Sequence, residues 1–206
     1  MLVSDLQEEL ALHVHDVNNG EVTSAQWLMF INSAARDART SGWLVRQTDD
    51  TSIEVDASTY EYDIPAGFAY IQELYIEETI NQSSVYVREI PRSHWDVRLN
   101  ASTGNPELSF NTLSELTPSK HIRIIGQKRP TIYISPTQTI DAGMEGFIRE
   151  RALYYGYRFL GAGLSELSKW RQDMAKMSFT TAESMLHRQP QEMRELPNSI
   201  EVPGRG

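Results

Sequence analysis

Residues 23–43, TSAQWLMFINSAARDARTSGW, carry a strong helical signal. Thr23 precedes Gln26 by three residues, a capping-box spacing in which the two residues satisfy free N–H groups at the start of a helix. Apolar residues then recur in steps of three and four, which places them on one face. This face consists of Trp27, Phe30, Ile31, Ala34, Ala35 and Ala38. Gly42 is placed to stop the helix, so the sequence predicts an amphipathic helix that ends just before Trp43.

Three further helices are predicted from the same periodicity. One covers residues 2–17 and ends at Asn18-Asn19-Gly20, because Asn and Gly tolerate the backbone of a helix C-terminus. Another follows Pro136 and is broken by Gly161-Ala162-Gly163, and the last runs from about Ser165 to His187. Their short glycine linker predicts an antiparallel hairpin. The expected core face of the last helix is its stripe of large apolar residues, Leu164, Leu167, Trp170, Met174, Met177 and Met185.

Between residues 43 and about 137 the helical period gives way to short β-rich runs. Several runs alternate apolar and polar residues, which is typical of a strand with one buried face. The predicted strands are 43–45, 51–55, 59–64, 70–77, 84–90, 107–111 and 121–125. Turn sequences rich in Gly, Pro and Asn separate them, and residues 91–100 are expected to hold a short helix or turn. Many short strands with regular turns suggest a small sandwich or barrel.

The predicted fold class is therefore α+β. A four-helix bundle-like domain comes from both ends of the chain, residues 1–42 and 138–188, and a small β sandwich or barrel, residues 43–137, is inserted between them. The last segment, residues 189–206, contains three prolines and few apolar side chains. Such a segment cannot build a core, so we expect an extended C-terminal tail.

Composition excludes several classes of protein. The 206 residues include no cysteine, which rules out disulfides, zinc–thiolate sites and a cysteine nucleophile. The N-terminus has no basic segment followed by an apolar run, and no stretch approaches the roughly 18 apolar residues of a membrane span. The sequence contains no HExxH motif, Gly-rich phosphate loop or GxSxG elbow. We therefore expect no enzyme activity, no cofactor, no metal and no membrane contact.

The formal net charge is −9, and acids gather in the predicted β region. Nine acidic residues fall between Arg46 and Arg88, with no lysine or arginine among them. One interpretation is a solubilising surface, and the other is a wall that DNA passes without sticking. Candidates to line such a channel are Asp49, Asp50, Glu54 and Asp56. A basic patch with interleaved aromatics is missing, which argues against a nucleic-acid-binding module.

Basic residues gather instead on the last two predicted helices, whereas the first two helices carry acids. Opposed charges on repeated faces would suit head-to-tail contacts between subunits of a ring. Surface pairing within one chain is the equally weighted alternative. The candidates are Arg149, Arg151, Arg158, Arg171 and Lys176. Trp95 lies in a polar segment, where it either covers an edge of the core or anchors a partner.

The order of several motifs resembles one known family, the head–tail adaptors of tailed bacteriophages. The run from Thr23 to Trp43 resembles the opening helix of that family, and Ser58 to Phe68 is similar to its next strand and turn. Ile90 to Trp95 and Gly104 to Pro106 are similar to the segment and turn that follow. Phe147 to Phe159 resembles the helix that comes after, and residues 164–188 resemble its partner helix.

The resemblance implies a helical bundle with an inserted β domain that forms a dodecameric ring under the portal. It also implies that the C-terminal tail docks on the portal and that a nozzle, tail tube or stopper binds the other side. Widely spaced apolar residues of the tail are the expected portal anchors, namely Met193, Leu196, Ile200 and Val202.

The expected location is the virion, at the head–tail junction, after assembly in the host cytoplasm. Genomic DNA is expected to pass through the ring without specific binding. The resemblance implies no catalysis and no cofactor. The alternative is an adaptor with added peptidoglycan-hydrolase activity, since some adaptors of short-tailed phages are linked to cell-wall hydrolysis.

Overall fold

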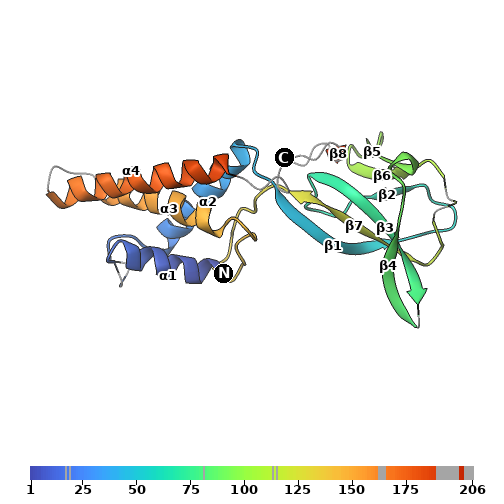
Figure 1. The fold of residues 1–206 in the computed structure, drawn as a ribbon, viewed down its shortest axis with the longest axis horizontal. Helices are drawn as coiled ribbons and strands as arrows, with labels where there is room; N and C mark the ends of the chain where they lie inside the picture. The colour runs from blue at the N-terminus through green and yellow to red at the C-terminus, as the bar shows by residue number, and fades with distance from the viewer. Residues whose placement is uncertain are drawn as a thin grey trace. The chain divides into compact units, whose positions relative to one another are not determined.

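The computed structural model describes residues 1–16, 18, 20–80, 82–112, 114, 116–161, 166–188 and 200–201, without the side chains of 46–49 and 200. The chain divides into a helical unit, residues 1–45 and 130–194, and a β unit, residues 46–129 and 195–206. The described part contains four α-helices and two antiparallel sheets (Figure 1), which confirms the α+β class.

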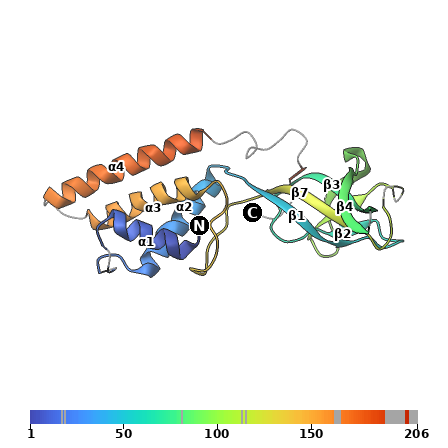
Figure 2. The same ribbon diagram turned by 60° about the horizontal axis from the view of Figure 1, so that its bottom comes forward.

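In the helical unit, α3 is the central helix. The helices are α1 (Val3–His13), α2 (Ser24–Thr40), α3 (Glu145–Leu160) and α4 (Glu166–His187). α3 contacts each of the other three, and Figures 1 and 2 both show it between α4 and α1. α3 and α4 are antiparallel, because Gly146 at the start of α3 lies near Met185, and Leu160 at its end accepts a hydrogen bond from Arg171.

The predicted start and buried face of α2 are both confirmed. The backbone N–H of Gln26 donates to Thr23 Oγ1 at 3.3 Å, and the backbone N–H of Thr23 donates to Gln26 Oε1 at 2.8 Å. All six residues of the predicted apolar face are buried. Gly42 follows the helix with φ +75°, a backbone conformation that glycine adopts without strain.

The first helix is shorter than predicted, ending at His13 where we expected residue 17. Its end is set by Asp16, whose carboxylate accepts hydrogen bonds from the backbone N–H groups of Gly20, Glu21 and Val22 at 2.7–2.9 Å. This acceptor turns the chain toward α2 before another helical turn can form. Val17 lies outside the described residues.

The predicted core face of α4 is wrong for Leu167, Trp170 and Met177 and only partly right for Met174 and Met185. The residues that α4 buries are small or polar: Ser168, Ala175, Ser178 and Ala182. Of the expected stripe, Leu167, Trp170 and Met177 are 54, 40 and 63% exposed. Met174 and Met185 are half-buried and pack against the helical core, and Leu164 lies outside the described residues. The small residues follow one another at steps of seven, three and four, so they share one face and let the backbone of α4 approach α3 closely.

The β unit contains two sheets that share one core. Its strands are β1 (Val45–Glu54), β2 (Glu61–Asp63), β3 (Tyr70–Ile80), β4 (Ser83–Glu89), β5 (Trp95–Leu99), β6 (Pro106–Phe110), β7 (His121–Lys128) and β8 (Ile200–Glu201). One sheet has the order β1-β7-β3-β4 with β8 on β3, and the other has the order β2-β6-β5. Buried side chains from both sheets form a single apolar cluster that includes Leu74, Ile124 and Leu108.

Two segments of the β unit differ from prediction. β1 is one continuous strand where two short runs were expected. Residues 91–100, expected to be a short helix or turn, form a 3-10 turn over Arg92–His94 and then the strand β5. Pairing with Phe110 aligns β5 on β6, and Trp95 enters the core with 2% of its surface exposed. Trp95 therefore covers the core and is not an exposed anchor.

Candidate interaction surfaces

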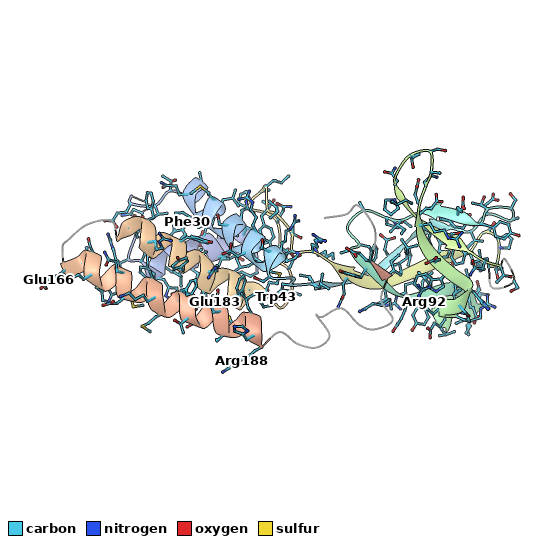
Figure 3. The ribbon with its side chains drawn as sticks, turned by 90° about the horizontal axis from the view of Figure 1, so that it is seen from above. Phe30, Trp43, Arg92, Glu166, Glu183 and Arg188 are labelled. Atoms are coloured by element: carbon cyan, nitrogen blue, oxygen red, sulfur yellow. The ribbon has the colours of Figure 1, made fainter. Side chains whose placement is uncertain are left out.

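Arg151 on α3 links three helices through acids of its own chain. Its Nε lies 2.6 Å from Asp37 Oδ2 of α2, and its Nη1 lies 2.9 Å from Glu183 Oε1 of α4. Burial works to lower the pKa of Arg151, but the Asp37 hydrogen bond and charge outweigh it, so the pKa is raised. Burial and the hydrogen bond to Asp37 raise the pKa of Tyr155 to about 12. Glu183 is labelled in Figure 3 on α4.

Arg171 and Arg149 also find partners within the chain. Arg171 pairs with Glu21 and donates from Nη1 to the Leu160 carbonyl at 3.2 Å. Partial burial works to raise the pKa of Asp16, but its backbone hydrogen bonds and nearby Arg171 outweigh this effect and lower it. Arg149 contacts acids on both sides, with Nη1 3.3 Å from Glu9 Oε1 and Nε 3.4 Å from a neighbouring glutamate.

The other two interface candidates are more exposed. Arg158 donates from Nη1 to the Tyr154 hydroxyl at 2.9 Å. Lys176 lies 3.1 Å from Asp173 on its own helix, and its side chain is 78% exposed. Thus Arg149, Arg151 and Arg171 join helices of one chain, while Arg158 and Lys176 face solvent.

Part of the large apolar stripe of α4 is exposed to solvent. We call Leu167, Trp170, Met174 and Met177 the outer seam, since they follow steps of three, four and three along α4. Trp170 lies partly against Tyr157, with ring centroids 5.8 Å apart, and against His15 at 6.4 Å. Leu167 and Met177 are more than half exposed. In Figure 3 α4 runs between the labelled Glu166 and Arg188 at the edge of the helical unit, beside α3.

A second apolar surface, which sequence reasoning missed, lies on the loop before α3. Ile134 is 84% exposed although the loop around it is firmly held. Asn32 donates to the Tyr133 carbonyl and accepts from its N–H, both at 2.8 Å, and Gln138 Oε1 accepts from the N–H of Ile134 at 2.6 Å. The buried Asp141 accepts from the N–H of Thr131 at 2.6 Å.

The start of the chain is hydrogen-bonded to the same loop. The N–H of Ser4 donates to the Pro136 carbonyl at 2.9 Å, and Leu2 pairs with Thr139 in an isolated β-bridge. Leu2 is 40% exposed. We call Leu2 and Ile134 the loop patch. No local sequence signal marks it, because Ile134 lies in a loop and its exposure depends on partners such as Asn32, more than a hundred residues away.

The channel-lining candidates lie on β1 and in the turn that follows it. Glu54 and Asp56 are exposed, and Asp50 is half-buried with its carboxylate accepting from the N–H of Ser52 at 3.0 Å. Hydrogen bonds from Ser58 hold the pKa of Asp56 below its usual value. The side chain of Asp49 lies outside the described residues. Glu54 therefore faces solvent, and the carboxylates of Asp50 and Asp56 accept hydrogen bonds from residues two positions further along the chain.

One titratable cluster in the β unit superficially resembles catalytic machinery. Glu77 accepts from the Ser84 hydroxyl and from the backbone N–H of His121, and His121 Nδ1 lies 2.9 Å from Glu77 Oε2. Together these bonds lower the pKa of Glu77 to about 2. In a hydrolase triad the histidine lies between serine and acid. Here the acid lies between the other two, so Ser84 has no adjacent base in this cluster. The hydrogen bonds of the cluster instead link β3 to β4 and β7.

The described part of the C-terminal tail is one short strand, β8. Ile200 and Glu201 form β8, which pairs antiparallel with Ile71 and Tyr70 at the start of β3. Arg129 Nη2 lies 4.0 Å from Glu201 Oε1. Met193, Leu196 and Val202, the other predicted portal anchors, lie outside the described residues.

The described residues provide no metal site, since they hold no suitable group of His, Asp and Glu side chains. None of the described helices is long and apolar enough to cross a membrane. What the described surface does offer is exposed apolar side chains on α4 and on the Ile134 loop. These are features of a protein that binds other proteins.

Comparison with known protein families shows the family of the chain. The sequence model of the SU10 adaptor protein family matches residues 1–199. The chain belongs to this family. The family is one of bacteriophage head–tail adaptors, so the adaptor is a structural virion component that interacts with portal and tail proteins. A search of the curated proteins gives no match.

Proposed function

We propose that the adaptor assembles as a dodecameric ring that joins the portal to a tail nozzle, tube or stopper. The family match over residues 1–199 carries this proposal. The exposed Leu167, Trp170 and Met177 on α4 support it, because exposed apolar patches mark protein–protein contacts. The proposed ring sits at the head–tail junction of the virion and assembles in the host cytoplasm.

The ring is tested by mass photometry of the purified adaptor, alone and mixed with its cognate portal. We expect the mass of the free chain in the first sample and a portal-bound ring of many copies in the second. An adaptor that ignores the portal at all accessible concentrations would contradict the proposal.

We further propose that residues 189–206 dock on the portal through Met193, Leu196, Ile200 and Val202. A tail rich in proline with a few spaced apolar residues suits an extended peptide that becomes ordered on a partner. Deleting residues 189–206 should abolish portal binding, but it also removes β8 from the β unit. The sharper variant is Met193→Ser with Leu196→Ser, which leaves Ile200 and Glu201 in place. Portal binding equal to that of the unmodified chain would refute the docking role of these two residues.

We also propose that the acids on and after β1 face the DNA channel of the ring, where negative charge keeps DNA from sticking. The exposed Glu54 is the best site for a test, because Asp50 and Asp56 cap turns. Virions with Glu54→Lys should release DNA more slowly, with the largest effect at low salt. Unchanged release at every salt concentration would leave the acids as a solubilising surface.

The alternative with peptidoglycan-hydrolase activity finds no favourable arrangement among the described residues. The Ser84, Glu77 and His121 cluster has the wrong order for a triad. We expect no clearing band when the purified adaptor is run on a peptidoglycan zymogram. A band that one carboxylate substitution abolishes would establish the hydrolase.

A further inference from the structure

α4 carries two apolar stripes, and the helical unit uses one of them. Small residues, among them Ser168, Ala175 and Ala182, face α3. The outer seam lies beside this packed stripe and repeats at steps of three and four. Residues with this spacing share one side of a helix, where they can pack together into a groove or against a second surface. Leu167 and Met177 at its two ends are 54 and 63% exposed. A surface helix would normally carry polar residues at such positions.

The loop patch has the features of the complementary surface. Ile134 is 84% exposed on a loop whose backbone is fixed by Asn32, Gln138 and Asp141. Burial raises the pKa of Tyr133 in this loop, whose hydroxyl accepts from the Asp141 N–H at 3.1 Å. A loop that is already ordered loses little conformational entropy when it binds. The loop therefore exposes the Ile134 side chain to solvent, and it would lose little further conformational entropy when a partner binds there.

The two surfaces lie on different sides of the helical unit. The start of α1 and the loop bonded to it are on one side of α3, and α4 is on the other, as Figures 1 and 2 both show. A head-to-tail contact in a closed ring needs two unlike patches on each subunit. A partner of a different sequence would require only one of them.

We propose that the outer seam of one copy packs against the loop patch of the next copy in the ring. The inference rests on the proposed ring and names its contact. Charges at the edges agree with this pairing: Lys176, beside Met177, is 78% exposed, and its own partner Asp173 is 72% exposed, so their surface ion pair contributes little and can be exchanged. Asp5, whose carboxylate accepts from the N–H of Leu2, is exposed. Lys176 of one copy can thus face Asp5 of its neighbour.

A cysteine pair tests the contact directly, because the chain contains no cysteine. Ile134→Cys and Met177→Cys are combined in one chain, which is assembled on the portal, oxidised and run on a non-reducing gel. Disulfides between neighbours should produce a ladder of multimers. The matched control combines Ile134→Cys with Lys169→Cys, since Lys169 is exposed on another side of α4. This control should stay mostly uncrosslinked.

A charge substitution gives a second readout. Met177→Glu should weaken ring formation on the portal by at least about tenfold, because it would bury an unpaired charge against the apolar Ile134 in every contact of the ring. Its thermal unfolding should match the unmodified chain, because the side chain is 63% exposed. Lys169→Glu makes a larger change of charge on the same helix and should assemble normally.

The outcomes separate this inference from the proposed function. A ladder from the Ile134 and Met177 pair, with impaired assembly of Met177→Glu, supports the contact. A ring that assembles without the ladder, or with an equal ladder from the Lys169 control pair, overturns the contact and leaves the ring intact. Failure of the unmodified adaptor to form any ring on the portal overturns the proposed function itself.

Discussion

Substituting Gly156 by alanine should destabilise the helical unit, although alanine is the better helix former. Gly156 lies within α3, where an added Cβ would be 2.5 Å from Trp27 Cη2 and 2.7 Å from Trp27 Cζ3. The Trp27 side chain is completely buried, and its ring packs edge-on against Phe30 at a centroid distance of 5.7 Å. The indole therefore cannot move aside without disturbing the core between α2 and α3.

Two opposing effects set the size of the change. Replacing glycine by alanine inside a helix normally stabilises it by about 1 kcal/mol. Carbon atoms in contact are normally about 3.5–4.0 Å apart, so the new methyl group would overlap the indole by about 1 Å. Overpacking of this kind costs about 1–3 kcal/mol and occasionally more. With a buried indole as the neighbour we take the upper end, which leaves a net destabilisation of about 2 kcal/mol.

The free energy of unfolding is measured by urea denaturation, with the helical signal at 222 nm as the probe. Gly146→Ala in the same helix is the matched control, because its Cβ would meet Met185 Cε at 3.6 Å, an ordinary contact. The control should be unchanged or more stable by up to about 1 kcal/mol. Adding Trp27→Phe should make Gly156→Ala less costly. A Gly156→Ala chain as stable as Gly146→Ala would refute the tight packing of α2 on α3.

Three other substitutions probe the remaining contacts. Because the pKa of Glu77 is lowered from 4.5 to about 2, its stabilisation is present above pH 4.5 and is lost as pH falls toward 2; Glu77→Gln should lower the urea midpoint at pH 7 and flatten its fall with acid, while Glu54→Gln, at an exposed position of the same unit, should do neither. Arg151→Met leaves two carboxylates without their cation and should cost about 2 kcal/mol in urea unfolding; an unchanged midpoint would show that these pairs add nothing. Gly126→Ala would place a Cβ 2.1 Å from the Tyr70 carbonyl oxygen, so it should unfold the β unit at least about 2 kcal/mol more easily; hydrogen exchange of β3 and β7 as slow as in the unmodified chain would contradict this.

The sequence predicted best where a structural feature depends on near neighbours. The start of α2 was correct because the capping box joins Thr23 and Gln26, which are three residues apart. The end of α1 was wrong because it depends on Asp16 binding the backbone N–H groups of residues 20–22, and helical periodicity does not report such a bond. The strand at residues 95–99 was missed although its residues alternate between apolar and polar, because it is only five residues long and its pairing partner, β6, lies beyond the following turn.

The candidate interaction surfaces were only partly predictable. Arg149, Arg151 and Arg171 were identified as a group by charge alone, but charge could not show that their partners are acids of their own chain. The helical spacing of the outer seam was recognised in the sequence, but its residues were predicted to be buried in the core. Ile134 was not found, because its exposure follows from hydrogen bonds made by Asn32, Gln138 and Asp141 to its loop.

By itself the sequence determined the α+β class, the positions of most helices and strands, and the resemblance to phage adaptors, because caps, periodicity and turns act over a few residues. Tertiary structure alone decided which of the two stripes of α4 is buried. Both stripes repeat with the helical period, so neither is favoured locally. Close approach to α3 favours the small side chains of Ser168, Ala175, Ser178 and Ala182, and that leaves Leu167 and Met177 on the surface.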